Sequence, residues 1–197
     1  MLNYNFYESK TTSQRLLVML HGFISDASTF APHIEVLTDK VSVLTIELPG
    51  HGQDQSDAAQ TWNFDFIRDA LDEVLAQFDE YQIYLHGYSM GGRAALYYAL
   101  HGHQTLEGLI LESTSPGIAD EEDRVSRKQV DEARAKVLEI AGLEVFVNDW
   151  EKLPLFASQA DKMTKEERKR HREMRLAQDP KGLSLIHISE PTRQAEI

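Results

Sequence analysis

Runs of apolar residues alternate with amphipathic segments through the first half of the chain. Continuous apolar stretches predict strands buried on both faces, and they lie at Arg15–Leu20, Val41–Leu48, Gln82–His86 and Leu106–Leu111. Helical spacing separates them, most clearly where apolar residues recur at Phe64, Ile67, Leu71, Val74, Leu75 and Phe78. Shorter helices are expected at Thr29–Leu37 and Ala94–Leu100. Strands that alternate with helices predict a parallel sheet with right-handed crossovers.

The pattern changes after Ser115–Gly117, where the chain becomes charged and loses its strand-like runs. The first of three expected helices is marked by apolar residues at Val125, Val130, Ala133, Val137 and Ile140. The other two cover Glu144–Trp150 and the densely charged Lys165–Met174. We therefore expect an α/β core over residues 1–116 and a helical cap over residues 117–182, lying above the carboxyl ends of the strands.

The segment Leu183–Arg193 breaks the preceding charged helical pattern without a linker. Its sequence resembles the in-frame translation of a sequencing adapter, so residues 183–197 are expected to be a non-native tail and are set aside from fold and function. The Leu/Ile content of the segment would also allow a genuine short strand. If the tail is non-native, the reading frame is truncated, and His187 has no catalytic meaning.

Composition narrows the classes of partner. The chain has 197 residues, with 32 acidic residues against 20 basic ones and a formal net charge of -12, which disfavours nucleic acid and anionic membranes as general partners. Cysteine is absent, which fits a cytoplasmic location. The N-terminal residues show no signal-peptide pattern, and no apolar run approaches the ~20 residues of a membrane span. No cluster of ligands with convincing spacing implies a metal or cofactor.

The stretch Leu85–Arg93 joins a predicted strand to a predicted helix. It contains Gly-x-Ser-x-Gly, with Ser89 between Gly87 and Gly91, and this pattern is typical of a nucleophile elbow. The strain at such a turn and the close approach of helix and strand require the glycines. We therefore expect the hydroxyl of Ser89 to stand over the end of the sheet, although the pattern alone also fits an ordinary strand-to-helix turn.

Two further loops follow strands at the same edge of the predicted sheet. In His21-Gly22-Phe23 the glycine allows a sharp turn, so the backbone N–H of Phe23 is a candidate oxyanion-hole donor. His21 is expected to be structural, with hydrogen bonds to neighbouring backbone. In Pro49-Gly50-His51-Gly52, His51 is expected to be solvated, with substrate contact as the alternative.

Taken together, His21-Gly22-Phe23, Leu48-Pro49-Gly50-His51-Gly52 and Gly87-Tyr88-Ser89-Met90-Gly91-Gly92-Arg93 resemble the α/β-hydrolase superfamily. The arginine after the elbow, Ser115-Pro116-Gly117 and the charged cap are similar to one branch of it, MenH. The resemblance implies an α/β-hydrolase core with a mostly parallel sheet and a helical cap. It also implies a lyase of menaquinone biosynthesis, which eliminates pyruvate from 2-succinyl-5-enolpyruvyl-6-hydroxy-3-cyclohexene-1-carboxylate without a cofactor.

The same resemblance implies roles for single residues. Ser89 would be the base that removes a ring proton, while the backbone N–H groups of Phe23 and Met90 would form the oxyanion hole. The residues implied to bind the anionic substrate are Tyr88, Arg93, Arg127, Trp150 and Arg175. Forked guanidinium groups suit a substrate with several carboxylates, and an acidic protein would need to gather them locally.

The sequence departs from the family pattern at the catalytic partners of the serine. In this family an Asp or Glu and then a His follow the cap, but nothing native is expected there, so the last strands and the triad Asp and His are absent. Asp179 and His171 stand in charged helical context and are not nominated. We expect the chain to be nearly inactive and to self-associate through an unpaired sheet edge.

Two other classes of function remain open from the sequence. A serine esterase or C–C bond hydrolase on the same fold would be labelled at Ser89 by a fluorophosphonate. A non-catalytic binding module would use the fold without a triad.

Overall fold

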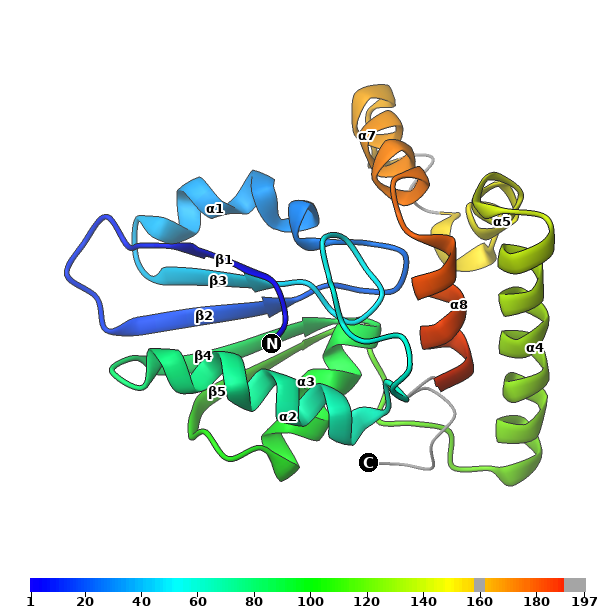
Figure 1. The fold of residues 1–197 in the computed structure, drawn as a ribbon. Coiled ribbons are helices and arrows are strands. Elements are labelled where there is room, and N and C mark those ends of the chain that lie inside the picture. The colour runs from blue at the N-terminus through cyan, green and yellow to red at the C-terminus, as the bar shows by residue number, and fades with distance from the viewer. Residues whose placement is uncertain (158–161, 190–197) are drawn as a thin grey trace.

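The computed structural model describes residues 1–157 and 162–189 and contains a five-stranded sheet (Figure 1). The strand order is β1-β3-β2-β4-β5, and all neighbours are parallel except the antiparallel pair β1 and β3. The strands are β1 (Tyr4–Tyr7), β2 (Arg15–Leu20), β3 (Ser42–Ile46), β4 (Gln82–Tyr88) and β5 (Leu106–Glu112). The four predicted strands are thus confirmed, with a mostly parallel sheet.

The first strand, β1, was not predicted from the sequence. It is four residues long, pairs Tyr4 with Ile46 of β3, and is largely exposed. The alternation Leu2-Asn3-Tyr4-Asn5-Phe6 is a strand signal, but it covers only a short stretch at the chain start and was not used for the prediction. Its position is set by pairing with the fully buried β3, which only the folded sheet reveals.

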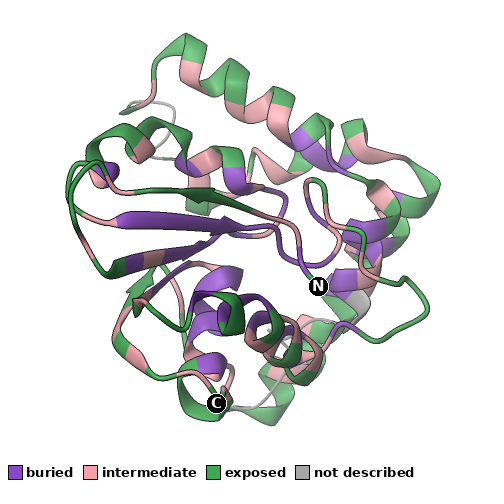
Figure 2. Ribbon diagram, turned by 60° about the vertical axis from the view of Figure 1, so that its left-hand side comes forward, coloured by how far each residue is buried: buried purple, intermediate pink, exposed green. Residues whose placement is uncertain are grey.

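Helices cover both faces of the sheet. The helix α1 (Ala31–Thr38) lies on one face, and α2 (Phe64–Leu75) and α3 (Met90–His101) lie on the other (Figure 1). The predicted spacing in α2 is confirmed, because Ile67, Leu71 and Val74 are all buried. Buried residues are concentrated in the central strands, so the sheet that carries the elbow is the most fully packed part of the molecule (Figure 2).

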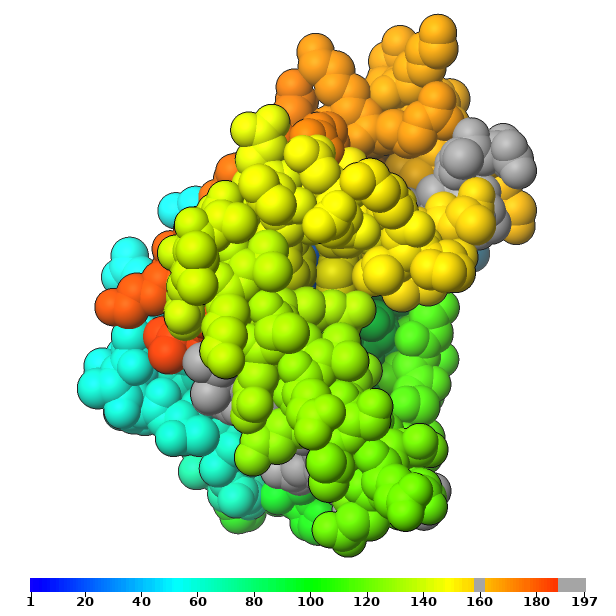
Figure 3. All heavy atoms as spheres, turned by 90° about the vertical axis from the view of Figure 1, so that its right-hand side faces the viewer, coloured from blue at the N-terminus to red at the C-terminus, as the bar shows by residue number. Residues whose placement is uncertain are grey.

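The cap helices lie beyond the carboxyl ends of the strands (Figure 1). They are α4 (Glu121–Ile140), α5 (Leu143–Trp150) and α7 (Lys165–Leu176), with a short 3-10 turn at Pro154–Phe156. Residues of α4 and α5 form much of the outer surface at this end (Figure 3). A separate apolar cluster of Ile24, Leu138, Phe146, Val147 and Leu183 joins the cap to the loop after β2. All three predicted cap helices are therefore present, and they are anchored to the core.

The last described element, α8 (Pro180–Ser189), corrects an expectation. Residues from 183 on were set aside from the fold, but Leu183 and Ile186 are fully buried and His187 is 2% exposed. The helix packs along α4, and its apolar side chains close the cap against the core, so neither an excluded tail nor a strand describes this segment. The non-native origin of the segment stays a prediction, and residues 190–197 lie outside the described part.

Within residues 1–157 and 162–189, no helix is long and apolar enough to cross a lipid bilayer. Within the same ranges, no group of three or more His, Cys, Asp or Glu side chains is arranged to hold a metal ion.

Candidate active site

The turn between β4 and α3 has the geometry of a nucleophile elbow. Ser89 has φ 53° and ψ −115°, a strained backbone for a residue with a side chain. A Cβ at Gly87 would lie 2.3 Å from the carbonyl oxygen of Gly91, and one at Gly91 would lie 2.4 Å from that of His21. Only glycine fits at these two positions, and this close approach is what holds Ser89 at the tip of the turn.

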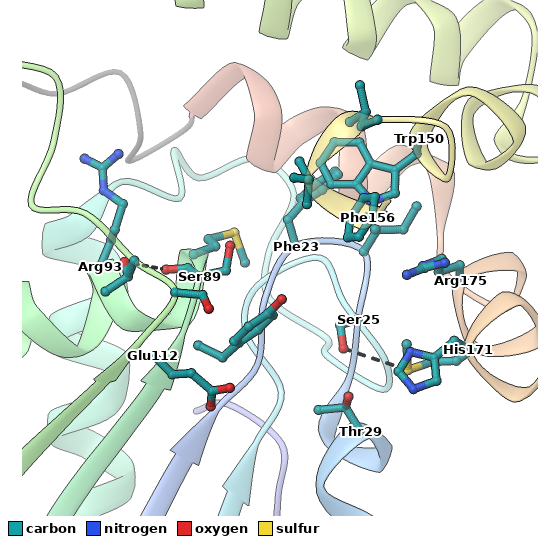
Figure 4. A pocket seen from close by; sticks show the side chains of 18 of the residues that line it. Phe23, Ser25, Thr29, Ser89, Arg93, Glu112, Trp150, Phe156, His171 and Arg175 are labelled. Carbon is teal, nitrogen blue, oxygen red and sulfur yellow. Dashed lines mark hydrogen bonds between the residues drawn. The ribbon is translucent and has the colours of Figure 1, made fainter. Parts of the chain in front are cut away.

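Two interactions tie Ser89 to the adjacent strand. Its backbone N–H donates to the carbonyl oxygen of Glu112 at 2.9 Å, and the Oγ1 of Thr114 donates to the carbonyl oxygen of Ser89 at 2.8 Å (Figure 4). Both contacts use the serine backbone, so the strained conformation is maintained without occupying the hydroxyl. The side chain of Ser89 is left facing the space between core and cap.

The loop after β2 lies directly against the elbow. A Cβ at Gly22 would lie 3.4 Å from the Cβ of Ser89, which places the neighbouring Phe23 beside the serine. Neither Phe23 nor Met90 donates its backbone N–H to another of the described residues. An oxyanion hole needs two N–H groups that lie near the reacting hydroxyl and are not hydrogen-bonded within the fold. Their role stays a prediction.

A reciprocal pair of histidines ties the loops after β2 and β3 together. The Nε2 of His21 accepts from the N–H of Leu48 at 3.0 Å, while the Nε2 of His51 accepts from the N–H of Ile24 at 3.1 Å. In each ring the Nδ1 contacts a nearby carbonyl oxygen, that of Gly22 in one case and Pro49 in the other. This confirms the structural role expected for His21 and stabilises the backbone that presents Phe23.

The expectation that His51 is solvated is wrong. The side chain is 1% exposed, and its ring centroid lies 5.2 Å from that of His21. Burial, and after it the nearby His21, lowers the pKa of His51 to about 3, so the ring is neutral at ordinary pH. The glycines that flank His51 in the sequence indicated a loop, but not that this loop folds back into the core.

One cavity of about 790 Å³ lies between the elbow and the cap (Figure 4). Every site residue predicted from the sequence lines it, and they come from β2, β4, α3 and the cap: Phe23, Tyr88, Ser89, Met90, Arg93, Arg127, Trp150 and Arg175. The aromatic part of its wall is built by Phe23 and Trp150, whose ring centroids are 5.2 Å apart. The structure therefore brings together residues that are up to 152 positions apart in the sequence, as the pair Phe23 and Arg175 shows.

The cavity wall is rich in arginine. Its described lining includes five arginines, Arg93, Arg127, Arg134, Arg170 and Arg175, but only two carboxylates, Glu112 and Glu167. In a chain with a formal net charge of -12, this is a local reversal of sign. Such a wall favours an anionic ligand, because guanidinium groups bind carboxylates through forked hydrogen bonds.

The three predicted arginines are held in different ways. Arg93 is 4% exposed, with its guanidinium carbon 5.6 Å from the ring centroid of Phe64, and Figure 4 shows it turned away from Phe23 and Trp150. The Nη1 of Arg175 donates to the Oε1 of Glu151 at 2.8 Å. The Nε of Arg127 donates to both carboxylate oxygens of Asp131 at 2.9 Å. Arg93 thus lies deepest, while the other two are fixed within the cap.

Two comparisons with known proteins bear on this site. A sequence profile for the family described as alpha/beta hydrolase fold matches residues 15–182. The structure of MenH from S. aureus superposes with a TM-score of 0.96 at 51% sequence identity, covering 99% of this chain and 73% of that one. The chain belongs to the MenH branch of the α/β-hydrolase fold family. A hydrolase from Pseudomonas aeruginosa superposes with a TM-score of 0.80 at 20% identity, and this likeness bears on the fold alone.

Curated relatives of this MenH-like chain are longer than it is. A 2-succinyl-6-hydroxy-2,4-cyclohexadiene-1-carboxylate synthase from Shigella dysenteriae is 36% identical over 150 residues, which are 76% of this chain and 58% of the relative. The chloroplastic protein PHYLLO from Arabidopsis thaliana is 31% identical over 140 residues, 68% of this chain and 8% of that protein. The chain therefore spans less than two thirds of the length of either.

The catalytic partners expected for Ser89 are not in place among the described residues of this MenH-like chain. None of its eight histidines, all within the described residues, makes a hydrogen bond with the hydroxyl of Ser89. One histidine–carboxylate pair lines the wall: His86 Nε2 lies 3.0 Å from Glu112 Oε2. It joins β4 to β5 and does not involve the serine. Asp179 accepts from backbone N–H groups at the start of α8, so its contacts are those of a helix cap.

Glu112 and Arg134 also line the cavity, although neither was predicted from the sequence as a site residue. Glu112 ends β5 in register with Tyr88, so pairing of the two predicted strands would have placed its carboxylate at the carboxyl end of the sheet. Arg134 lies seven residues after Arg127 and three after Asp131, a spacing that puts all three on one face of a helix. The spacing of Arg127, Asp131 and Arg134 could be seen in the sequence, but the many other charged residues of α4 gave no reason to single it out.

Proposed function

We propose that this chain carries the serine and the anion-binding wall of a lyase that eliminates pyruvate from 2-succinyl-5-enolpyruvyl-6-hydroxy-3-cyclohexene-1-carboxylate, in the cytoplasm. The observation that carries the proposal is the arginine-rich cavity at Ser89 in an acidic chain. The named product of the Shigella relative, 2-succinyl-6-hydroxy-2,4-cyclohexadiene-1-carboxylate, bears a ring carboxylate and a succinyl carboxylate. A wall of guanidinium groups suits such a ligand better than it suits a neutral ester.

The chemistry requires removal of one proton and loss of one leaving group. The Ser89 oxygen takes the proton from ring C2, and the C–H electron pair forms the C2–C3 double bond. The C3–C4 double bond moves to C4–C5, and the C5–O bond to the enolpyruvyl group breaks. The departing enolate gains a proton and becomes pyruvate, so no water is consumed. Negative charge that develops on oxygen during this step would be stabilised by the N–H groups of Phe23 and Met90.

The arginines would hold the substrate rather than react with it. Arg127 and Arg175 lie on the cap side of the cavity and are fixed by Asp131 and Glu151, so little side-chain entropy remains to be lost on binding. Arg93 lies deeper, on the elbow helix. Tyr88 and Trp150 supply apolar and aromatic surface against the ring. With arginines both on the cap side and on the elbow helix, the charged ends of the ligand would be held apart while its ring lies at Ser89.

The rate expected of this chain is low. A serine hydroxyl is a weak base until a histidine takes its proton, and loss of a triad member costs several orders of magnitude. Since no histidine among the described residues makes a hydrogen bond with the hydroxyl of Ser89, we propose that substrate binding is largely retained while turnover is slow.

Pyruvate release tests the proposal. The chain is incubated with the enolpyruvyl substrate, and pyruvate is followed with lactate dehydrogenase and NADH, against Ser89→Ala and a protein-free blank. Slow release that disappears in Ser89→Ala supports the lyase. Equal rates in the chain, the variant and the blank, together with turnover of p-nitrophenyl esters at Ser89, would instead support a hydrolase.

A further inference from the structure

A fully buried carboxylate lies at the centre of the cap. Asp131 on α4 is 0% exposed, and both of its oxygens accept from the Nε of Arg127 at 2.9 Å. The Nη1 of Arg134 lies 3.7 Å from one of these oxygens, within ion-pair range but beyond hydrogen-bond distance. Asp131 therefore orients Arg134 through charge without taking up its N–H donors.

A second contact fixes Arg134 from the other side. Its guanidinium carbon lies over the ring of Trp150, 5.3 Å from the centroid, which is a cation–π distance. Among the described residues no hydrogen bond to Arg134 is present, yet the side chain is only 27% exposed and lines the cavity. Burial holds the pKa of this guanidinium below its usual value, and the charge of Asp131 offsets only part of that shift.

The surroundings of Arg134 suit a group that binds a ligand. Its orientation is set by Asp131 and Trp150, its five N–H donors are not used within the described part of the fold, and it opens on the same cavity as Ser89. We propose that Arg134 binds a carboxylate of the substrate beside Arg127. This inference rests on the proposed function, since it concerns the same cavity.

A merely structural role makes a different prediction. If Arg134 served only to balance the charge of Asp131, its removal would lower stability and would weaken every ligand alike. If it binds a carboxylate, its removal weakens only those ligands that carry that carboxylate. The two roles are separated by changing the ligand as well as the protein.

The experiment is a calorimetric titration with 2-succinyl-6-hydroxy-2,4-cyclohexadiene-1-carboxylate and its two monoamides, each of which neutralises one carboxylate. Arg134→Gln should weaken the dicarboxylate about ten- to hundredfold, the range expected for a charged hydrogen bond. It should leave one monoamide unchanged, because that ligand lacks the carboxylate that Arg134 binds. Arg134→Lys, which keeps the charge but loses the fork, should give an intermediate loss.

A matched control comes from the same helix. Lys128 is exposed and only 3.9 Å from Glu132, so Lys128→Gln removes one positive charge from α4 without touching the cavity wall, and its affinities should equal those of the unaltered chain. Thermal melting of each variant shows whether the cap still folds. Asp131→Asn adds a test of positioning: combined with Arg134→Gln, it should weaken binding by less than the product of the two single effects.

The outcomes are distinct. Equal losses for all three ligands, or no loss for the dicarboxylate, overturn the role of Arg134. If the chain still binds the dicarboxylate and releases pyruvate in that case, the proposed function stands and only this inference fails. If the unaltered chain binds none of the ligands, both fail.

Discussion

The core and the cap hold their functional groups by different means. Around Ser89, positions are set by backbone: Gly87 and Gly91 allow elements to touch, and His21 and His51 join two loops through main-chain N–H groups. In the cap, positions are set by long charged side chains paired with one another, as for Arg127 with Asp131. The core fixes reacting atoms, whereas the cap arranges charge.

This difference matters for function. The close backbone packing around Ser89 tolerates almost no change, because a methyl group added at Gly87 or Gly91 would meet a carbonyl oxygen. A guanidinium group has five N–H donors, so an arginine that is held by one carboxylate can also bind a carboxylate of a ligand. We infer that reaction type is specified by the core and ligand choice by the cap, so substitutions in the two regions should differ in both size and kind.

The largest expected effect is at Gly91. Its added Cβ would lie 2.4 Å from the carbonyl oxygen of His21, and backbone must move to admit it, so Gly91→Ala should lower the free energy of unfolding by about 3 kcal/mol or more. In the cap, Gly142 has φ 85° and nothing within 4 Å of its would-be Cβ. Gly142→Ala should therefore cost only about 1 to 2 kcal/mol of backbone strain.

Urea unfolding of the two variants checks this comparison. A Gly91→Ala chain as stable as Gly142→Ala would mean that the elbow is not as tightly packed as the structure shows.

The next effect concerns His51 and pH. An ordinary histidine, with a pKa of 6.5, takes up a proton in the unfolded chain below that pH, whereas folded His51 stays neutral down to about 3. The unfolded state then binds more protons, so stability falls as pH falls from 6.5 towards 3. By about pH 5 the loss should reach about 2 kcal/mol from His51 alone.

Burial also lowers the pKa of His171, so this residue too makes stability fall as the pH falls. The contribution of His51 is therefore isolated by comparing the unaltered chain with His51→Gln. The variant should be less stable at about pH 7 but should lose less stability on acidification. His33→Gln, which removes an exposed histidine, should keep the original slope. Parallel slopes for His51→Gln and the unaltered chain would contradict a neutral, buried His51.

The smallest effect is expected at the free edge of the core. Among described residues β5 pairs only with β4, and Ile110 and Leu111 on it are 50% and 41% exposed. Such an edge favours weak pairing between copies. Sedimentation velocity should show concentration-dependent association, reduced by Ile110→Lys, while the matched cap variant Ile140→Lys should leave it unchanged. A monomer at all concentrations would refute the prediction.

The same contrast explains what the sequence could predict. Core elements follow from apolar runs, and the elbow from its glycines, because those signals are local. The short β1 and the burial of His51 depend on pairing and on loop return, which are not local. In the cap, helices were predicted but not the pairing of charges, since one face of α4 carries Arg127, Asp131 and Arg134 among many charged residues. The packing of α8 was not predicted, because residues 183–197 were set aside on account of their expected origin.

The central claim is the proposal that Ser89 is the base of the elimination and that no histidine hydrogen-bonded to it activates it. Added imidazole tests this most directly, since a small base can enter the cavity and take the serine proton. We predict that pyruvate release from the enolpyruvyl substrate rises at least about tenfold with neutral imidazole and not at all in Ser89→Ala. An imidazole effect that is absent, or equal in the two proteins, would contradict the account.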